Sequence, residues 1–402
     1  MDRRRMIRLL AAGSMPILTG TRTFGQAPAR KYELLLKGGR VIDPSQSFNA
    51  PADVAIAGGR IAAIARDIDA AESDRTVPVA GQVVTPGLVD LHTHGFAGVS
   101  HWGLDLDQHC LARGVTTAID AGTSGSDSFD GFRRLVIEPS RARVLAFLNI
   151  SRIGLIGQPG ELVDTRMIDV ASALRVAKAH ADVIVGIKVR CSENYSGPND
   201  LVAVRAARTV ADQIGKPVMI HVGNPYSPME KILELTQPRD IVTHAFRRAG
   251  GGGVIGPDGR VPAYIRHAAE RGILFDVGHG SGSFSFAAAE AALQQNFPPA
   301  TISSDIHAYS ALGPVFELPT TMTKFLHLGL TLEKVVELTT VAPARAIGKI
   351  VEMGSLKPGS AADVAVFDLV NGDFSLVDSQ GEVRKAKQKL VPVLTLRQGR
   401  IP

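Results

Sequence analysis

Short apolar runs alternate with helix-like segments through the middle of this 402-residue chain. The runs are rich in β-branched residues and cover residues 83–92, 115–122, 143–151, 182–189, 217–223, 240–246, 273–279 and 301–307. Between them lie Ala- and Leu-rich segments such as 167–181, 201–215 and 262–272. Buried parallel strands that alternate with helices form βαβ units. Eight such units in about 230 residues predict a (β/α)8 TIM barrel, and an open doubly wound sheet is the alternative.

The two ends of the chain differ from this middle part. They contain short alternating segments that are separated by Gly and Pro turns and are typical of strands, at residues 32–43, 52–65, 354–369 and 391–401. We therefore predict an α/β fold in which residues 84–345 form the barrel. Residues 30–83 and 346–402 would together form a small β-sandwich domain.

Residues 1–29 have the features of a secretory signal peptide. A basic start precedes a short apolar stretch, and small residues follow at 27–29. Paired arginines followed by Met6, Ile7 and Arg8 match the twin-arginine pattern, which predicts a periplasmic or secreted protein. A disordered basic tail is the alternative. The apolar stretch is too short and too interrupted to span a bilayer, so we expect no membrane span.

The net charge of +5 comes mainly from this segment, because residues 1–29 contain five Arg and one Asp. The rest of the chain is close to neutral, so we do not expect nucleic-acid binding. The two cysteines, Cys110 and Cys191, are too few for a disulfide framework. A small-molecule substrate is the expected partner, and the pattern leaves homo-oligomer formation open.

Several predicted barrel strands end in a side chain that can bind a metal ion. These side chains are His92, His94, Lys188, His221, His244, His279 and Asp305. A single histidine on an apolar strand is more often a hydrogen-bonded core residue, and a single lysine more often reaches solvent. Here, however, five of the eleven histidines lie at strand ends. Barrel enzymes carry their chemistry at these ends. Converging imidazole and carboxylate groups suit a borderline-soft divalent metal, so the pattern predicts a metal centre.

His92 and His94 are two residues apart, so both side chains point to the same face of their strand. Lys188 is the unusual member of the set, because a nearby dication favours the neutral form of its amine. A neutral amine can react with CO2 to give a carbamate, which would bridge two metal ions. A lysine that pairs with the substrate is the alternative.

In order and placement, these residues resemble the binuclear site of the amidohydrolase superfamily of metal-dependent hydrolases. The HTH motif at 92–94, the strand-end Lys, the later His residues and the final Asp carry the resemblance. The segments GGRVIDP, PGLVDLHTH and GSLKPGSAADVAVFD resemble the family's split β-sandwich around the barrel. The likeness extends over residues 31–400 and is strongest to the deacetylases described as dihydroorotase-like.

The resemblance implies a role for each of these positions. His92, His94 and Asp305 would bind the more buried of two divalent ions, with zinc expected, and His221 and His244 would bind the second. Lys188, carboxylated on its amine, would bridge both ions together with a hydroxide. Asp305 would also act as the general base that accepts the proton of this nucleophile and passes it to the leaving group.

One departure from the family pattern argues against a true dihydroorotase. That enzyme is expected to have an Arg two residues after the HTH motif, where this chain has Phe96. We therefore predict a metal-dependent hydrolase that removes a short acyl group from a small N-acyl or O-acyl carboxylic acid. The alternatives are a cyclic amidase of the dihydroorotase or hydantoinase type and a non-catalytic metal- or solute-binding protein.

Arginines near the strand ends are candidates for binding a substrate carboxylate. Arg190 lies two residues beyond Lys188 and shares its face of the strand, so we predict that it binds substrate. A loop charge on the surface is the alternative, and for Arg247 and Arg248 it is the interpretation that we favour.

Two further residues complete the predicted substrate site. His279 would orient the substrate carbonyl or donate a hydrogen bond to Asp305. Tyr226 would place its hydroxyl near the leaving group, and loop packing is the alternative for this side chain.

Overall fold

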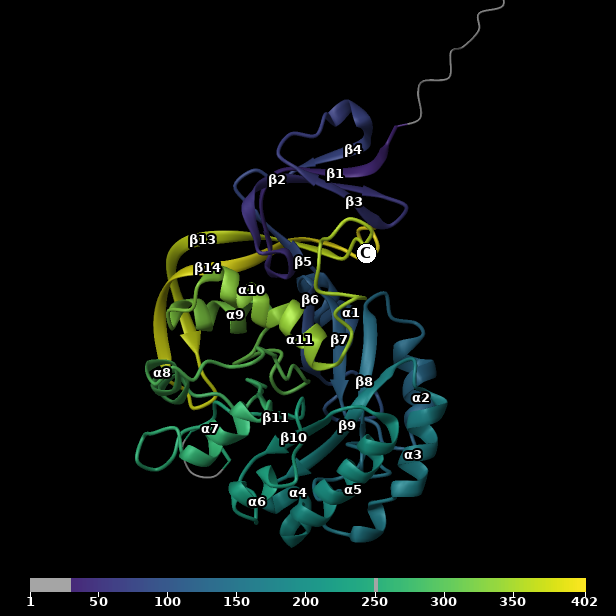
Figure 1. The fold of residues 1–402 in the computed structure, drawn as a ribbon, viewed down its shortest axis with the longest axis vertical. Coiled ribbons are helices and arrows are strands. Elements are labelled where there is room, and N and C mark those ends of the chain that lie inside the picture. The colour runs from purple at the N-terminus through teal and green to yellow at the C-terminus, as the bar shows by residue number, and fades with distance from the viewer. Residues whose placement is uncertain (1–29, 249–251) are drawn as a thin grey trace, which may run out of the picture.

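The computed structural model describes residues 30–248 and 252–402. The predicted signal segment, residues 1–29, lies outside these described residues. The described part contains two seven-stranded sheets, and helices surround one of them (Figure 1). Across the described ranges, no helix is both long enough and apolar enough to cross a membrane.

The sheet at the centre is a parallel barrel, as the alternating pattern predicts. Its strands pair in chain order and are β6 (Leu88–Thr93), β7 (Val115–Ala121), β8 (Arg143–Asn149), β9 (Ile184–Cys191), β10 (Val218–Val222), β11 (Ile241–Thr243) and β12 (Leu274–Phe275). Residues 301–306 close the barrel through isolated bridges from Thr301 to Asp276 and from Ile306 to Thr93. This eighth segment is irregular because Asp305 has φ +48°, whereas a β-strand requires a negative φ.

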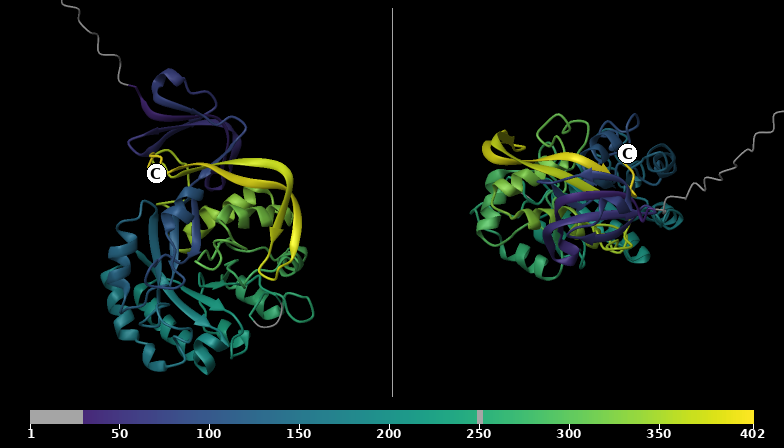
Figure 2. Two further views of the ribbon diagram at one scale, coloured as in Figure 1. Left: turned by 180° about the vertical axis from the view of Figure 1, so that it is seen from behind. Right: turned by 90° about the horizontal axis from the view of Figure 1, so that it is seen from above.

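Helices cover the outside of the barrel (Figure 2). They are α1 (Leu106–His109), α2 (Phe129–Phe132), α3 (Val170–Ala179), α4 (Glu193–Ser196), α5 (Asp200–Ile214), α6 (Met229–Leu233), α7 (Ala263–Glu270), α8 (Phe286–Gln294), α9 (Leu318–His327), α10 (Leu332–Thr339) and α11 (Val341–Ala346). Three of them, α3, α5 and α7, occupy the segments in which the sequence predicts helices. The carboxylate of Asp169 accepts a hydrogen bond of 2.9 Å from the backbone N–H of Ser172, which stabilises the first turn of α3.

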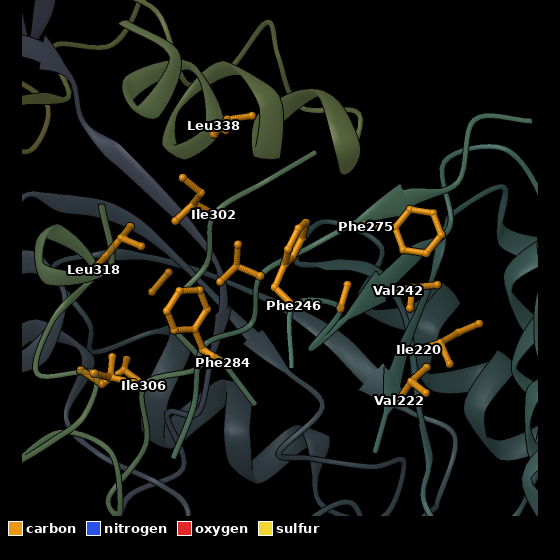
Figure 3. Packing of buried hydrophobic residues seen from close by; sticks show 14 of the residues in the cluster. Ile220, Val222, Val242, Phe246, Phe275, Phe284, Ile302, Ile306, Leu318 and Leu338 are labelled. Atoms are coloured by element: carbon orange, nitrogen blue, oxygen red, sulfur yellow. The ribbon is translucent and has the colours of Figure 1, made fainter. Parts of the chain in front are cut away.

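The loops that follow β11 and β12 are anchored in the apolar core. Phe246 and Phe284 belong to these loops, and both are fully buried beside Ile302 and Leu318 (Figure 3). The ring of Phe284 also lies 5.6 Å from that of Phe325 on α9. Burying a phenylalanine contributes roughly 2 to 3 kcal/mol, so these loops are held against the barrel although they lack regular structure.

The second sheet is assembled from both ends of the chain, as the two β-rich ends predict. Its strands are β1 (Tyr32–Asp43), β2 (Phe48–Ala57), β3 (Arg60–Ala65), β4 (Ser73–Pro78), β5 (Val83–Pro86), β13 (Val364–Val377) and β14 (Val383–Leu396). Strand β5 joins the two ends because it pairs with β1 on one side and with β13 on the other. The chain enters the barrel at Gly87, where a Cβ atom would lie 2.2 Å from Thr116 Oγ1.

The β13–β14 hairpin extends beyond this sheet along the side of the barrel (Figure 1). Strands of 14 residues extend over about 45 Å, whereas β13 pairs with β5 only through Val364–Phe367. The inner side chains Leu376, Ala386 and Leu390 are buried in the same apolar cluster as the barrel core. The C-terminal segment therefore packs against both parts of the molecule, while the predicted domain boundaries stay a prediction.

Candidate metal centre and cavity

A cavity of about 650 Å³ opens at the ends of the barrel strands. Five of the six residues that were predicted to hold metal come from strands β6, β9 and β10, from the residue after β11 and from the eighth segment; the sixth, His94, directly follows β6. All six line the cavity. Its walls also contain Trp102, Leu155, Arg190, Ser192, Glu193, Asn194, Tyr195, Gly223, Asn224, Arg247, Ser281, Gly282, Ser283 and His307.

His92, His94 and Asp305 form the tightest group of these residues. Asp305 Oδ1 lies 3.3 Å from His92 Nε2 and 3.1 Å from His94 Nε2. One ligand atom from each of the three residues lies within 4.8 Å of the others. Because His92 and His94 lie two residues apart, both rings reach the same carboxylate, as the alternation of a strand requires.

Hydrogen bonds fix the tautomers of two imidazoles. Thr243 Oγ1 donates its proton to Asp276 Oδ2 at 2.8 Å. A hydroxyl has one proton to donate, so Thr243 accepts the 2.9 Å hydrogen bond that it shares with His92 Nδ1. His244 Nδ1 lies 2.6 Å from the carbonyl oxygen of Gly278, which can only accept. Both rings therefore carry their proton on Nδ1 and present the Nε2 lone pair to the site, as a metal ligand does.

The other two imidazoles lie beside this pair. His94 Nδ1 is 2.7 Å from Thr123 Oγ1, and the Thr123 N–H donates to Asp120 Oδ1 at 2.7 Å. The ring centroid of His221 is 4.2 Å from that of His244. The four rings thus converge on one region although they come from three different strands.

Lys188 lies within this group and is 1% exposed. Its Nζ is 3.3 Å from His92 Nε2 and 3.4 Å from the sulfur of Met219. The pKa of this amine is lowered to about 7, mainly by burial; the charge of Asp305 opposes the shift and that of Arg190 contributes to it. Gly122 leaves room for the side chain, since a Cβ atom there would lie 2.6 Å from Lys188 Cβ.

Two candidate ligands have a left-handed backbone. His244 has φ +68° and Asp305 has φ +48°, and neither residue is glycine. Such a conformation costs on the order of 1 to 3 kcal/mol and persists where the surrounding structure imposes it. Residues of this kind cluster at functional sites, so the strain supports a role for both side chains.

These residues fit a divalent metal ion. Asp305 Oδ1 is buried and has no hydrogen-bond partner in the described part of the chain, although it faces the lone pair of His92 Nε2. Burial lowers the pKa of His94 and His244 to about 3 and holds the pKa of His92 and His221 well below the usual range. The imidazoles are therefore neutral, which is the form that binds metal. A metal cation bound by these groups would offset the repulsion between the carboxylate oxygen of Asp305 and the lone pair of His92 Nε2.

Of the three predicted substrate-binding residues, Arg190 lines the cavity, whereas His279 and Tyr226 do not. Arg190 lines the cavity and is 5% exposed, so it is not a surface charge. His279 is fully buried, and its Nε2 lies 2.6 Å from Lys324 Nζ rather than in the cavity wall. Tyr226 is 65% exposed and is not part of the wall. The tyrosine that does line the cavity is Tyr195.

Sequence reasoning missed several residues of the wall. Arg247 was expected on the surface, but it is partly buried and lines the cavity, whereas Arg248 is exposed. His307 and Trp102 also line it, with ring centroids 4.7 Å apart. The position of Arg247 three residues after His244 was a usable signal, because loops that follow barrel strands form the site.

Phe96 lies two residues after the HTH motif, where a dihydroorotase is expected to have an Arg, and its side chain lies away from the cavity. Phe96 is 2% exposed and packs edge-to-face against Phe132 with centroids 5.2 Å apart. It is not among the residues that line the cavity. This position therefore offers no group to a substrate carboxylate.

The chain is similar to several known proteins along most of its length. A deacetylase of Agrobacterium fabrum is 39% identical over 347 residues, which cover 85% of this chain and 84% of that protein. A deacetylase of Enterococcus faecalis is 31% identical and covers 92% of this chain and 99% of its own length. The crystal structure of an adenine deaminase superposes with a TM-score of 0.86 at 30% identity over 92% of this chain and 99% of that chain. For the crystal structure of a dihydroorotase, the TM-score is 0.84 at 35% identity, over 91% and 96% of the two chains.

The family model described as the amidohydrolase family matches residues 83–401. This match includes the whole barrel, the candidate metal ligands and the C-terminal hairpin. The chain belongs to the amidohydrolase family and is a metal-dependent hydrolase.

Proposed function

We propose that this enzyme is a deacetylase that hydrolyses the amide or ester bond of a small N-acyl or O-acyl carboxylic acid. One observation carries the proposal: a buried group of neutral imidazoles, an amine and a carboxylate lies in a cavity whose wall contains two guanidinium groups. The relatives named deacetylase, which align with most of the chain, support it.

The residues for two metal sites are present in the cavity. His92, His94 and Asp305 would hold one ion, and His221 and His244 the other, with zinc expected from the donor set. Such ions polarise a carbonyl and lower the pKa of water toward neutrality. Lys188 would bridge the sites as a carbamate. This group forms when the neutral amine attacks CO2 and loses a proton, and burial of Lys188 favours that neutral form.

The chain's own groups perform the proton transfers. The carboxylate of Asp305 would accept a proton from the attacking water as a general base. It would then deliver this proton to the departing oxygen of an ester or nitrogen of an amide, so that the carboxylate is regenerated. The position of Asp305 Oδ1 within 3.3 Å of the Nε2 atoms of His92 and His94 supports this role.

We further propose that the enzyme is exported by the twin-arginine route and acts in the periplasm or outside the cell. The basis is the sequence of residues 1–29. N-terminal sequencing of the exported protein would test this, and an intact N-terminus in the cytoplasm would argue against it.

A substrate screen tests the proposed activity. Purified protein of measured metal content is assayed against N-acetyl amino acids, O-acetyl hydroxy acids, dihydroorotate and hydantoins. We expect release of acetate from the acetylated acids. The matched control is Asp305→Asn, which keeps the size of the side chain but removes the base, so turnover is expected to fall by about 100-fold or more.

Three other outcomes would contradict the proposal. Faster opening of dihydroorotate or hydantoins than of the acetyl compounds would indicate a cyclic amidase. Metal binding without turnover of any compound would indicate a non-catalytic protein. Unchanged turnover in Asp305→Asn would exclude Asp305 as the base.

A further inference from the structure

Two arginines line the cavity, and their charges are balanced differently. Arg190 Nη1 lies 3.3 Å from Glu161 Oε1, and both side chains are buried. The guanidinium also stacks on Tyr195, with its carbon 3.3 Å from the ring centroid. The positive charge of Arg190 is thus offset by a carboxylate of the protein, and an incoming anion would also meet Glu161.

Arg247 has no such counter-charge. It forms no ion pair with any residue in the described ranges, and its Nη1 donates a hydrogen bond to the carbonyl oxygen of Val222 at 3.3 Å. Burial lowers the pKa of this guanidinium below its usual value, which reflects an unneutralised charge in a partly buried position. The acidic residues in the cavity wall are Asp305, in the metal group, and the exposed Glu193.

A second polar group faces the same place. Ser192 is 3% exposed and lines the cavity, and its hydroxyl has no hydrogen-bond partner among the described residues. A Cβ atom on Gly223 would lie 1.8 Å from Ser192 Oγ and 3.3 Å from Arg247 Nη1. Glycine at position 223 therefore lets the Ser192 hydroxyl pack directly against the backbone, near the guanidinium of Arg247.

We propose that the part of the cavity wall formed by Ser192 and Arg247 binds the carboxylate of the substrate, with Arg247 as the residue that makes the enzyme specific for acylated acids. The inference rests on the proposed function. A guanidinium can donate two parallel hydrogen bonds to a carboxylate, and Ser192 can donate a third. Arg190 would instead hold Tyr195 in the wall, with Glu161 as the counter-charge of its guanidinium.

The position of Arg247 suits an acid that is acylated on the adjacent carbon. Arg247 follows His244 by three residues, and its hydrogen-bond partner Val222 is adjacent to His221. In a 2-acyloxy or 2-acylamino acid, one carbon separates the carboxylate from the heteroatom of the scissile bond. In the proposed arrangement, such a substrate would place its acyl carbonyl at the candidate metal ligands and its carboxylate at Arg247.

The test compares substrates that differ only in this charge. The pairs are 2-acetoxypropanoate with 2-acetoxypropanamide and N-acetylalanine with N-acetylalaninamide, and acetate release gives kcat/KM for each. Loss of one charge-assisted contact is expected to lower the ratio of acid to neutral kcat/KM by about 10- to 100-fold in Arg247→Gln. Arg248→Gln is the matched control, since Arg248 is exposed and adjacent in sequence, and its ratio is expected to equal that of the wild type.

An unchanged ratio in Arg247→Gln would overturn the inference and leave the deacetylase proposal intact. A larger fall in Arg190→Gln than in Arg247→Gln would assign the carboxylate to Arg190 and also overturn it. If no acetyl compound is hydrolysed, the proposed function fails, and calorimetric titration with lactate still decides the inference. Weaker lactate binding by Arg247→Gln than by Arg248→Gln supports a carboxylate site at Arg247, and equal binding refutes it.

Discussion

At the scale of single residues, the site depends on hydrogen bonds that fix the direction of each imidazole. The carboxylate of Asp276 accepts hydrogen bonds of 2.6 to 2.8 Å from the hydroxyls of Thr243, Thr301 and Ser303. With its own proton committed to Asp276, Thr243 must accept from His92 Nδ1. Groups of this kind around a metal typically change its affinity 10- to 100-fold.

The first prediction concerns Thr243. Replacing it by Val keeps the shape of the side chain but removes the acceptor, so that His92 can present a protonated Nε2 to the site. We expect the metal affinity to fall by roughly 10- to 100-fold, as measured by competition with a chromophoric chelator. Thr243→Ser retains the hydroxyl and should bind metal like the wild type. Equal affinity in Thr243→Val and the wild type would show that Thr243 does not set the orientation of His92.

The grouping of the candidate metal ligands in one cavity could be predicted from sequence because of their place on strands. Strand ends have a fixed direction, so His92, His94 and Lys188 point to the barrel axis wherever the barrel forms. Arg247 and Tyr195 lie in segments after strands, where no periodicity gives the direction of a side chain. Their approach to the cavity depends on loop packing, which the sequence pattern does not describe.

At the scale of elements, the loop after β12 is held by the C-terminal hairpin. Ser379, at the tip of the β13–β14 hairpin, donates to the carbonyl oxygen of Gly280 at 3.0 Å. Asp378 Oδ2 accepts from the N–H of Phe286 at 2.9 Å, at the start of α8. Gly280 packs so closely on Asp305, the proposed general base, that a Cβ atom would lie 2.2 Å from Asp305 Oδ2. A segment from the far end of the chain thus positions the backbone next to Asp305.

A buried lysine in the same region predicts how stability depends on pH. Lys324 on α9 is fully buried, and its Nζ contacts His279 Nε2 at 2.6 Å and the carbonyl oxygen of Pro314 at 2.9 Å. Burial lowers the pKa of Lys324 to about 7, although the charge of Asp378 opposes the shift. In the unfolded chain the pKa of Lys324 is near 10.5. Between pH 7 and pH 10.5 the unfolded state therefore binds more protons than the folded state, so the free energy of unfolding rises with pH.

We therefore compare the wild type with Lys324→Gln, which keeps a hydrogen-bond donor but cannot titrate. The free energy of unfolding of the wild type relative to this variant should increase from pH 7 to pH 10, with a slope of at most ~1.4 kcal/mol per pH unit. Urea denaturation at several pH values measures the difference. A difference that stays constant over this range would mean that Lys324 has the same protonation in the folded and unfolded states.

The sequence pattern does not predict the observed form of the segment 301–307 or the direction of the His279 side chain. The run at 301–307 has the composition of a strand, yet tertiary constraints at Asp305 reduce it to isolated bridges. His279 follows an apolar run like the candidate metal-binding histidines, but it lies four residues beyond β12. At that distance the strand no longer sets its direction, and the side chain packs against Phe284 and Lys324.

At the scale of the whole molecule, the two sheets and the metal group are built from distant parts of the chain. The β5 strand links both chain ends in one sheet, and the hairpin shares its apolar cluster with the barrel. The candidate ligands come from β6, β9, β10, the end of β11 and the closing segment. They can meet only when the barrel is closed, so metal binding should stabilise the folded state as a whole.

The last prediction follows from this linkage. A ligand that binds only the folded state stabilises it by about 4 kcal/mol when its free concentration is 1,000 times its Kd. Removal of metal by a chelator should therefore lower the Tm by several degrees, and restored zinc should recover it. Differential scanning calorimetry with metal analysis of the same samples measures the effect. His92→Ala removes one ligand and should show a much smaller response to zinc. An equal rise of Tm in His92→Ala would place the stabilising metal elsewhere in the protein, because a site formed by the convergence of β6 with the closing segment cannot lose His92 without loss of affinity.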